Sequence, residues 1–331
     1  MMSIPVRIGC VLAALLSVSA LLAPVLATNR PDQQFLDHTY APPMWPQVRD
    51  VEGRWHRPFV YPLRLADRLE LRFVQERAER VPLRWFSNGR LVSVDPAHAP
   101  WLPLGGDALG RDVYSRVLFG ARLSLGVALI ATVAAVVLGA AVGALAGFFG
   151  GRTDLLLMLV ADFFIVLPVI YVVLVLRAAM PLVLTTAEVF WATAVILALA
   201  GWPFAARGVR AVIAVEKTRE YAESARSAGA GEARILLRHL LPAANGILAV
   251  QASLLLPAFV MAEATLSFVG LGFSEPSASW GGMLREAGRG HAFADAPWLL
   301  APALTIALAM LSVQLLAGNA QFFTPRTRKW I

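Results

Sequence analysis

Six apolar runs along the chain are each long enough to cross a membrane as a helix. A spanning helix needs about 20 consecutive, mostly apolar residues. Charged residues gather between the runs, and only the third and fifth runs contain an acid, Asp162 and Glu263. The runs lie at about Ile8–Ala27, Leu123–Phe149, Leu155–Leu176, Val189–Ala206, Ile247–Val269 and Trp298–Ala317. The pattern predicts an all-α polytopic membrane protein with six transmembrane helices.

The first apolar run has two interpretations. Arg7 precedes it, and the letters PVLA before Thr28 are typical of the cleavage site of a secretory signal. The run is longer than the apolar core of a typical signal peptide, which favours a retained helix. Both interpretations place residue 30 outside the cytoplasm, so the second run crosses inward in either case.

Basic residues in the short loops set the expected orientation of the chain. Arg152 lies between the second and third runs, and three basic residues follow the sixth run. The rule that cytoplasmic loops are enriched in Lys and Arg places these loops and both termini in the cytoplasm. Seven more basic residues lie between the fourth and fifth runs, at Arg207, Arg210, Lys217, Arg219, Arg226, Arg234 and Arg238.

This orientation divides the chain into four segments. Residues 1–27 form the first transmembrane helix, and residues 28–118 form a long extracytoplasmic loop or subdomain. A five-helix core follows at 119–320, with a polar cytoplasmic loop at 217–242. Residues 321–331 form a short basic cytoplasmic tail.

The long extracytoplasmic loop carries signals of a fold of its own. Asn88-Gly89 between apolar flanks predicts the two-residue turn of a β-hairpin. The interleaved charges of Arg64–Arg80 predict a surface helix. The loop also holds four of the nine tryptophans, Trp45, Trp55, Trp85 and Trp101.

Composition agrees with a membrane protein and excludes several kinds of site. The chain is 58% hydrophobic and 15% charged, whereas soluble domains are about 45–50% apolar and about 25% charged. Arg carries almost all of the positive charge, because Lys occurs only at 217 and 329, and so no phosphate-binding Gly-Lys motif is present. Cys10 stands alone and the five His are scattered along the chain, so we expect no metal and no cofactor.

The segment Glu220–Pro242, EYAESARSAGAGEARILLRHLLP, interrupts the apolar pattern. It predicts two short helices joined by a glycine bend at residues 229–231, with Pro242 opening the next helix. Ala222, Ala225 and Gly229 form a strip of small residues that lets another backbone approach. A plain solvated loop explains neither the length nor the helical pattern, and membrane spans at both ends argue against a DNA-binding helix-turn-helix. The remaining interpretation is a docking element for a cytoplasmic partner.

The same segment resembles the EAA loop of binding-protein-dependent ABC transporter permeases. That motif reads Glu-Ala-Ala, three residues, Gly, nine residues, Ile, one residue and Leu-Pro. In this chain Ser224 replaces the first Ala, and His239 replaces the Ile. The resemblance implies coupling to an ATPase through Glu220, Glu223, Ser224, Ala225, Gly229, Leu241 and Pro242.

Two further blocks narrow the resemblance to the dipeptide, oligopeptide and nickel permease subfamily. Gly105–Leu125, GGDALGRDVYSRVLFGARLSL, is similar to its GTDxLGRDxxSRxxxGAR block, with Gly106 where Thr is usual. Ala262–Leu284, AEATLSFVGLGFSEPSASWGGML, is similar to a second block of the subfamily. Residues 28–100 and the end after Gly318 depart from its pattern. The matching positions of the first block are Gly105, Asp107, Gly110, Arg111, Asp112, Ser115, Arg116, Gly120 and Arg122.

The resemblance implies the six-helix fold of type I (MetI-like) ABC importer permeases, which work by alternating access. The implied partners are a second, distinct permease, two cytoplasmic ATPase subunits and an extracytoplasmic solute-binding protein. The chain would then be no enzyme itself and would lie in a bacterial inner membrane. Peptides are the commonest cargo of the subfamily, and nickel or another small solute is the alternative.

Asp162 and Glu263 leave a second hypothesis open. Ionisable groups at membrane depth face a cavity or the bundle interior and pair with a neighbour, which favours a structural or pathway-lining role. Pro168 and Pro257 free backbone groups in the same two spans. An ion-coupled secondary transporter or an intramembrane protease built around the two acids is the alternative, although neither requires a glycine-bent basic loop.

Overall fold

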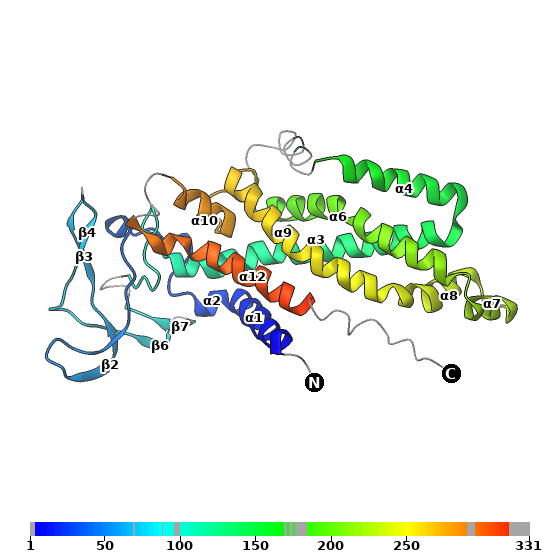
Figure 1. Cartoon of the computed structure of the whole chain (residues 1–331). Coiled ribbons are helices and arrows are strands. Elements are labelled where there is room, and N and C mark those ends of the chain that lie inside the picture. Colours follow the sequence, from blue (N-terminus) through cyan, green and yellow to red (C-terminus); the bar gives the residue numbers. More distant parts are fainter. Residues whose placement is uncertain are drawn as a thin grey trace. The chain divides into compact units, whose positions relative to one another are not determined.

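The computed structural model describes residues 4–68, 70–87, 89–95, 100–168, 171, 175, 184–289 and 295–317. These residues form two compact units, which we describe in turn. The first unit contains residues 4–12, 127–262 and 310–317, and the second contains residues 13–126 and 263–309. Four helices, α1, α3, α9 and α12, contribute residues to both units (Figure 1).

Five helices of the described residues are long and apolar enough to cross a membrane, which confirms a polytopic membrane protein. They are α1 (Ile4–Leu21), α3 (Val113–Phe149), α6 (Thr186–Glu216), a continuous helical stretch at Glu232–Val269, and Pro297–Ala317, which contains α12 (Ala301–Ala317). The predicted third span appears as α4 (Gly151–Val166). The remainder of that span lies largely outside the described residues.

Two helices are longer than the apolar runs that predicted them. α3 begins at Val113, ahead of the expected Leu123, and α6 continues to Glu216, beyond the expected Ala206. At about 1.5 Å per residue, a 37-residue helix is about 55 Å long, against about 30 Å of hydrocarbon. Arg207 and Arg210, which the sequence places between the fourth and fifth apolar runs, therefore lie within α6.

In the first unit, α3 and α6 pack with their backbones in contact. Gly139, Gly143 and Gly147 occur at every fourth residue of α3 and face α6. A Cβ added at Gly139 would lie 2.5 Å from the Ala205 Cβ, and one at Gly147 would lie 2.7 Å from the Arg210 carbonyl oxygen. Small residues at this spacing are a common means of helix association in membranes.

α4 also packs on α6 in the first unit (Figure 1). Ala161, Trp202 and Ala206 form a small buried core between the two helices. The Arg210 guanidinium on α6 donates two hydrogen bonds to the Asp154 carboxylate on α4, at 2.9 and 2.5 Å. The helices are thus joined by an apolar core and an ion pair.

The predicted extracytoplasmic loop contributes short β-strands to the second unit. One three-stranded sheet has the order β1 (Gln47–Arg49), β2 (Trp55–Val60), β5 (Val81–Pro82). Two hairpins accompany it, β3–β4 (Leu63–Asp67, Arg72–Gln75) and β6–β7 (Arg84–Ser87, Arg90–Ser93). Their shared core consists of Ala41, Met44, Val60, Leu63, Val81, Trp101 and Leu102.

The β6–β7 pairing confirms the hairpin predicted from Asn88-Gly89. Gly89 has φ +73, whereas Asn88 itself lies outside the described residues. The surface helix predicted over Arg64–Arg80 is wrong, because β3 and β4 pair antiparallel there. Leu63 and Leu65 are two residues apart on β3, which is the period of a strand, and Phe73 of β4 pairs with Leu65.

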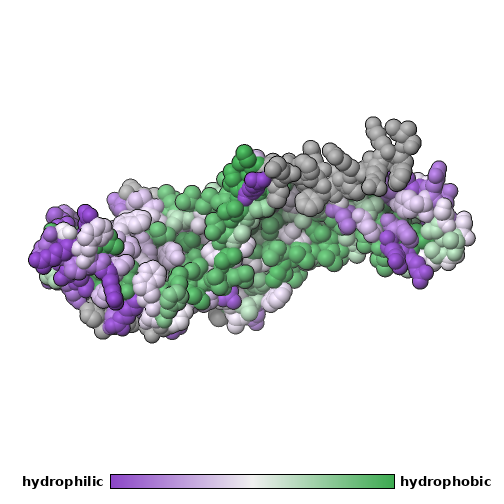
Figure 2. All heavy atoms as spheres, turned by 90° about the horizontal axis from the view of Figure 1, so that it is seen from below, coloured by the Kyte–Doolittle hydropathy of each residue, from purple (hydrophilic) through white to green (hydrophobic). Residues whose placement is uncertain are grey.

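The surface of the helices differs in polarity from the surface of the strands. Figure 2 shows hydrophobic side chains covering the long helices and hydrophilic side chains covering the strands. Large apolar side chains exposed on the helices include Leu129 and Val137 of α3 and Leu155 of α4. A soluble protein rarely exposes such a continuous apolar surface, whereas lipid contact accounts for it.

Candidate functional site

The predicted docking segment folds as a short exposed helix and a glycine bend. α7 (Glu220–Ser227) carries both of its acids in the first turn, where their negative charge interacts favourably with the positive end of the helix dipole. The Ala228 N–H binds the Ser224 carbonyl oxygen as the helix ends, and Gly229 follows with φ +79. That backbone conformation favours glycine, which accounts for the residue at this position.

The second half of the segment differs from the prediction. α8 (Glu232–Ile235), a π-helical turn (Leu236–Leu240) and a 3₁₀ turn (Leu241–Ala244) lead directly into α9 (Asn245–Val269). Pro242 therefore lies inside one continuous helical stretch and does not separate two helices. The π and 3₁₀ turns shift the backbone hydrogen-bond pattern, so the helical stretch continues across a proline that has no N–H to donate.

A buried apolar cluster holds this segment on the first unit. Ala222 of α7 and Ile235 of α8 are completely buried against Val209 and Ile213 of α6. Lys217 adds a polar clamp, because its ammonium donates to the carbonyl oxygens of Gly147 and Phe148 at 2.8 and 3.1 Å. A cation suits the last carbonyls of α3, which carry the negative end of the helix dipole.

The exposed face of α7 is accordingly not the one that the small residues suggested. Ala222 packs inside its own chain, and Ala225 is half-buried. No atom of the described chain lies within 4 Å of a Cβ added at Gly229, so the neighbouring space is open. The face that points outward consists of Glu220, Glu223, Ser224 and Ser227. Of the remaining positions predicted for coupling, Leu241 is half-buried and Pro242 is exposed.

The first sequence block, Gly105–Leu125, forms a polar junction in the second unit. Asp107 accepts from the Leu109 and Arg111 N–H groups, each at 2.9 Å, and its second oxygen pairs with the Arg111 Nε at 2.7 Å. Asp112 accepts from Ser115 at 2.5 Å and from Asn29 at 3.1 Å, both through side chains. Arg122 is exposed and takes no part in this junction.

Asp112 is completely buried, and burial raises its pKa, against the lowering effect of hydrogen bonds from Ser115, Thr28 and Asn29. Four donors surround one carboxyl group, including the Tyr114 N–H at 3.1 Å. Because Thr28 and Asn29 follow α2 (Ala23–Leu26), the junction fixes the end of the first helical segment to the start of α3.

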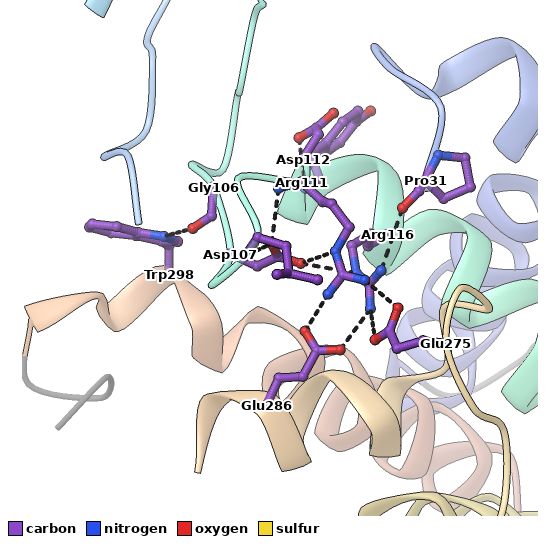
Figure 3. A network of polar contacts seen from close by, with 11 residues as sticks. Pro31, Gly106, Asp107, Arg111, Asp112, Arg116, Glu275, Glu286 and Trp298 are labelled. Atoms are coloured by element: carbon purple, nitrogen blue, oxygen red, sulfur yellow. Dashed lines mark hydrogen bonds and ion pairs between the residues drawn. The ribbon is translucent and has the colours of Figure 1, made fainter. Parts of the chain in front are cut away.

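The departure of Gly106 from the subfamily pattern has a local cause. A Cβ at Gly106 would collide with the His38 carbonyl oxygen, and one at Gly110 with the Phe35 carbonyl oxygen. The Gly106 carbonyl oxygen accepts from the Trp298 indole at 3.0 Å (Figure 3). The segment at residues 35–41, which belongs to the part of the chain that departs from the subfamily, thus excludes threonine at 106.

Arg111 and Arg116 meet two acids that the sequence did not single out. The Glu286 carboxylate pairs with Arg111 at 2.7 Å and with Arg116 at 3.1 Å. Glu275 pairs with both arginines as well (Figure 3). Both guanidinium groups are almost completely buried, with 2% and 1% of their side chains exposed. A buried arginine requires carboxylate partners, but the sequence shows neither that these arginines are buried nor which acids reach them.

The two glutamates share one excess negative charge. Asp107, Glu275 and Glu286 supply three carboxylates against the two guanidinium groups. Burial and the neighbouring Glu275 raise the pKa of Glu286 to about 7, against the lowering effect of both arginines. Burial acts upward on Glu275 too, but its hydrogen bond with Glu286 and the arginines lower its pKa. The pair therefore holds a proton near neutral pH.

The structure places the two predicted intramembrane acids in different surroundings. Asp162 on α4 pairs with Arg207 on α6, and half of each side chain is exposed. Glu263 on α9 is completely buried and accepts from the Ser267 hydroxyl at 2.7 Å. Pro257 lies inside α9, whereas Pro168 lies just beyond the end of α4. Asp162 belongs to the first unit and Glu263 to the second.

Comparison with known proteins places these features in a family. Residues 139–329, more than half of the chain, match the family described as binding-protein-dependent transport system inner membrane component. The chain belongs to this family. Over 233 residues it is 35% identical to a putative peptide permease protein of Brucella ovis, covering 70% of this chain and 74% of the relative.

Two relatives from Bacillus subtilis support the same assignment. The oligopeptide transport system permease protein OppC is 33% identical over 248 residues, which is 74% of this chain and 78% of OppC. The dipeptide transport system permease protein DppC is 36% identical over 230 residues, 69% of each chain. The chain is thus a multi-pass permease subunit of an ABC importer, a class that works with ATPase subunits, a solute-binding protein and a second permease.

Proposed function

We propose that this permease carries peptides and that α7 with Gly229 is the element that couples it to an ATPase. The coupling positions are Glu220, Glu223, Ser224, Ala225, Gly229, Leu241 and Pro242. The partner permease is a distinct chain, two cytoplasmic ATPase subunits bind from inside, and both termini face the cytoplasm of a bacterial cell whose inner membrane holds the complex.

The exposed polar face of α7 carries this proposal. A helix of eight residues is too short to be stable alone, and the buried Ala222 face holds it in place. Its opposite face, with Glu220, Glu223 and Ser224, has no packing role within the described chain. Such a rigidly held polar face is suited to contact with a soluble partner.

The relatives of this chain indicate a peptide cargo. The names of the three relatives given above refer to peptides, oligopeptides or dipeptides, and nickel remains the alternative for the wider subfamily. Among the described residues no cluster of three or more His, Cys, Asp or Glu has the arrangement of a metal site. Transport then proceeds by alternating access, in which the ATPases move α7 and the helices fixed to it.

Ser224→Trp tests the coupling surface without straining the backbone. Gly229→Glu is less informative, because φ +79 makes any side chain there unfavourable regardless of docking. Ser224 is exposed on α7. Ala233 is exposed on α8 at one of the unspecified positions of the motif, and it provides the matched control Ala233→Trp. We expect Ser224→Trp to reach the membrane normally, to recover fewer ATPase subunits on purification, and to lose peptide uptake.

The control should retain both ATPase recovery and uptake. Wild-type uptake by the Ser224→Trp strain would refute the coupling assignment. Unchanged dipeptide and oligopeptide uptake after deletion of the whole chain would refute the cargo assignment, independently of the coupling.

A further inference from the structure

A cavity of about 310 Å³ lies beside the Arg111 cluster in the second unit. Its wall includes Arg111, Glu275 and Glu286, together with Arg285 and Arg289 from α10 (Trp280–Ala287) and the residues that follow it. Tyr40 and Phe273 add aromatic surface to the lining, and Ser274 and Ser277 add hydroxyl groups. Pockets for small ligands have volumes of about 300–1,000 Å³, so this one suits a small ligand.

The cavity separates charge of the two signs. Arg111 and Glu286 lie on its buried side, where the carboxylates exceed the guanidinium groups by one. Arg285 and Arg289 are exposed, and neither forms an ion pair with another residue of the described segments. The Arg285 guanidinium lies over Gly270, whose φ of +93 and missing side chain leave room for it.

A ligand with a cationic and an anionic end satisfies both halves of this cavity. An ammonium group can take the place of the proton that Glu275 and Glu286 share, since it supplies the missing positive charge and several N–H donors. A carboxylate matches the planar guanidinium groups of Arg285 and Arg289. A short peptide carries these two ends and an apolar body for the aromatic wall.

We propose that this cavity receives the charged termini of a short peptide, with the ammonium at Glu275 and Glu286 and the carboxylate at Arg285 and Arg289. The proposal rests on the proposed peptide cargo. It places a peptide contact in the permease itself, on the side that the orientation of the chain assigns to the exterior. The binding protein is then not the sole determinant of which peptides pass.

The test uses the complete importer in lipid nanodiscs, without its binding protein. Saturation-transfer NMR would compare the dipeptide Ala-Phe with N-acetyl-Ala-Phe and with Ala-Phe amide. We expect binding of the free dipeptide, and at least about tenfold weaker binding of each blocked form, as for loss of a charge-assisted contact.

Two variants assign the ends of the ligand. Glu275→Gln keeps the size of the side chain, and the Asp107 and Glu286 carboxylates still pair with both buried arginines. Arg289 is exposed and lies outside these ion pairs, so Arg289→Gln leaves them in place. Glu275→Gln should weaken binding of Ala-Phe and Ala-Phe amide but not of the acetylated form, and Arg289→Gln should spare the amide. Arg54→Gln, at an exposed ion pair outside the cavity, should leave all three ligands unchanged.

Equal binding of the three ligands, or no effect of either cavity variant, would overturn the proposal. So would absence of Ala-Phe binding to nanodiscs from a strain that imports Ala-Phe through this chain, and in that case the peptide cargo would stand. Loss of the cargo itself would be seen separately, as dipeptide import that persists without the chain.

Discussion

The glycine contacts between α3 and α6 allow a sharp test by a single added carbon. Gly139→Ala places a methyl group 2.5 Å from the Ala205 Cβ and 2.6 Å from the Trp202 carbonyl oxygen. Carbon atoms pack at about 3.5–4.0 Å, so the helices must separate by about 1 Å over this turn. Overpacking of this kind costs about 1–3 kcal/mol.

The contact geometry also predicts that a second substitution, at Ala205, restores only part of the stability lost in Gly139→Ala. Ala205→Gly removes the nearest atom, but the Trp202 oxygen and the Ala206 nitrogen, at 2.6 and 2.9 Å, are backbone atoms and remain. We therefore expect Gly139→Ala combined with Ala205→Gly to recover only part of the lost stability. Because the two sites are in contact, their effects should not add.

The measurement is the melting temperature of the detergent-solubilised importer, followed by the fraction that survives heating as a single species on size-exclusion chromatography. A loss of about 1–3 kcal/mol corresponds to a decrease of several degrees. Val137→Ile is the matched control, since it adds one carbon to the same helix at a side chain that is 62% exposed. A Gly139→Ala importer as stable as the control would refute close backbone packing of α3 on α6.

Two further predictions concern the second unit. Gly106→Thr, which introduces the residue usual in the subfamily, should destabilise this chain by roughly 1–3 kcal/mol, because the side chain meets the His38 carbonyl oxygen. Proteolysis within residues 35–41 should then be faster, and proteolysis at the wild-type rate would contradict the prediction. The folded Glu275–Glu286 pair holds a proton that the unfolded chain releases, so stability should fall as pH rises from 4.5, the ordinary pKa of Glu286, to about 7. Melting temperatures across this range should show that slope, and Glu286→Gln should flatten it.

The membrane spans could be predicted from the sequence because a helix must contain about 20 mostly apolar residues to cross the hydrocarbon core. Five of the apolar runs correspond to long helices, even though their ends were misjudged. α6 continues past Ala206 because Arg207 and Arg210 find acids on α4, and a pattern based on apolarity alone does not detect that compensation. The same limit hid the continuation of α8 into α9 through Pro242.

The sites were predictable where the signal was local. Asn88-Gly89 indicated a hairpin correctly, because the turn itself selects those residues. The helix predicted at Arg64–Arg80 was wrong because the prediction relied on the interleaved charges. The alternating apolar residues, which indicate a strand, received too little weight. Glu275 and Glu286 were missed because their partners lie more than 150 residues away, and only the fold brings them together.

The close packing of α3 on α6 limits how α7, the proposed coupling helix, can move. A helix whose backbone touches a neighbour through glycines cannot rotate about its own axis, because each turn would drive a side chain into the facing backbone. The Lys217 clamp prevents the ends of the two helices from sliding apart. Under the proposed coupling, a force on α7 would tilt α6 together with the part of α3 that belongs to the first unit. An ATPase acting on α7 would then move these two helical segments of the first unit as a single rigid pair.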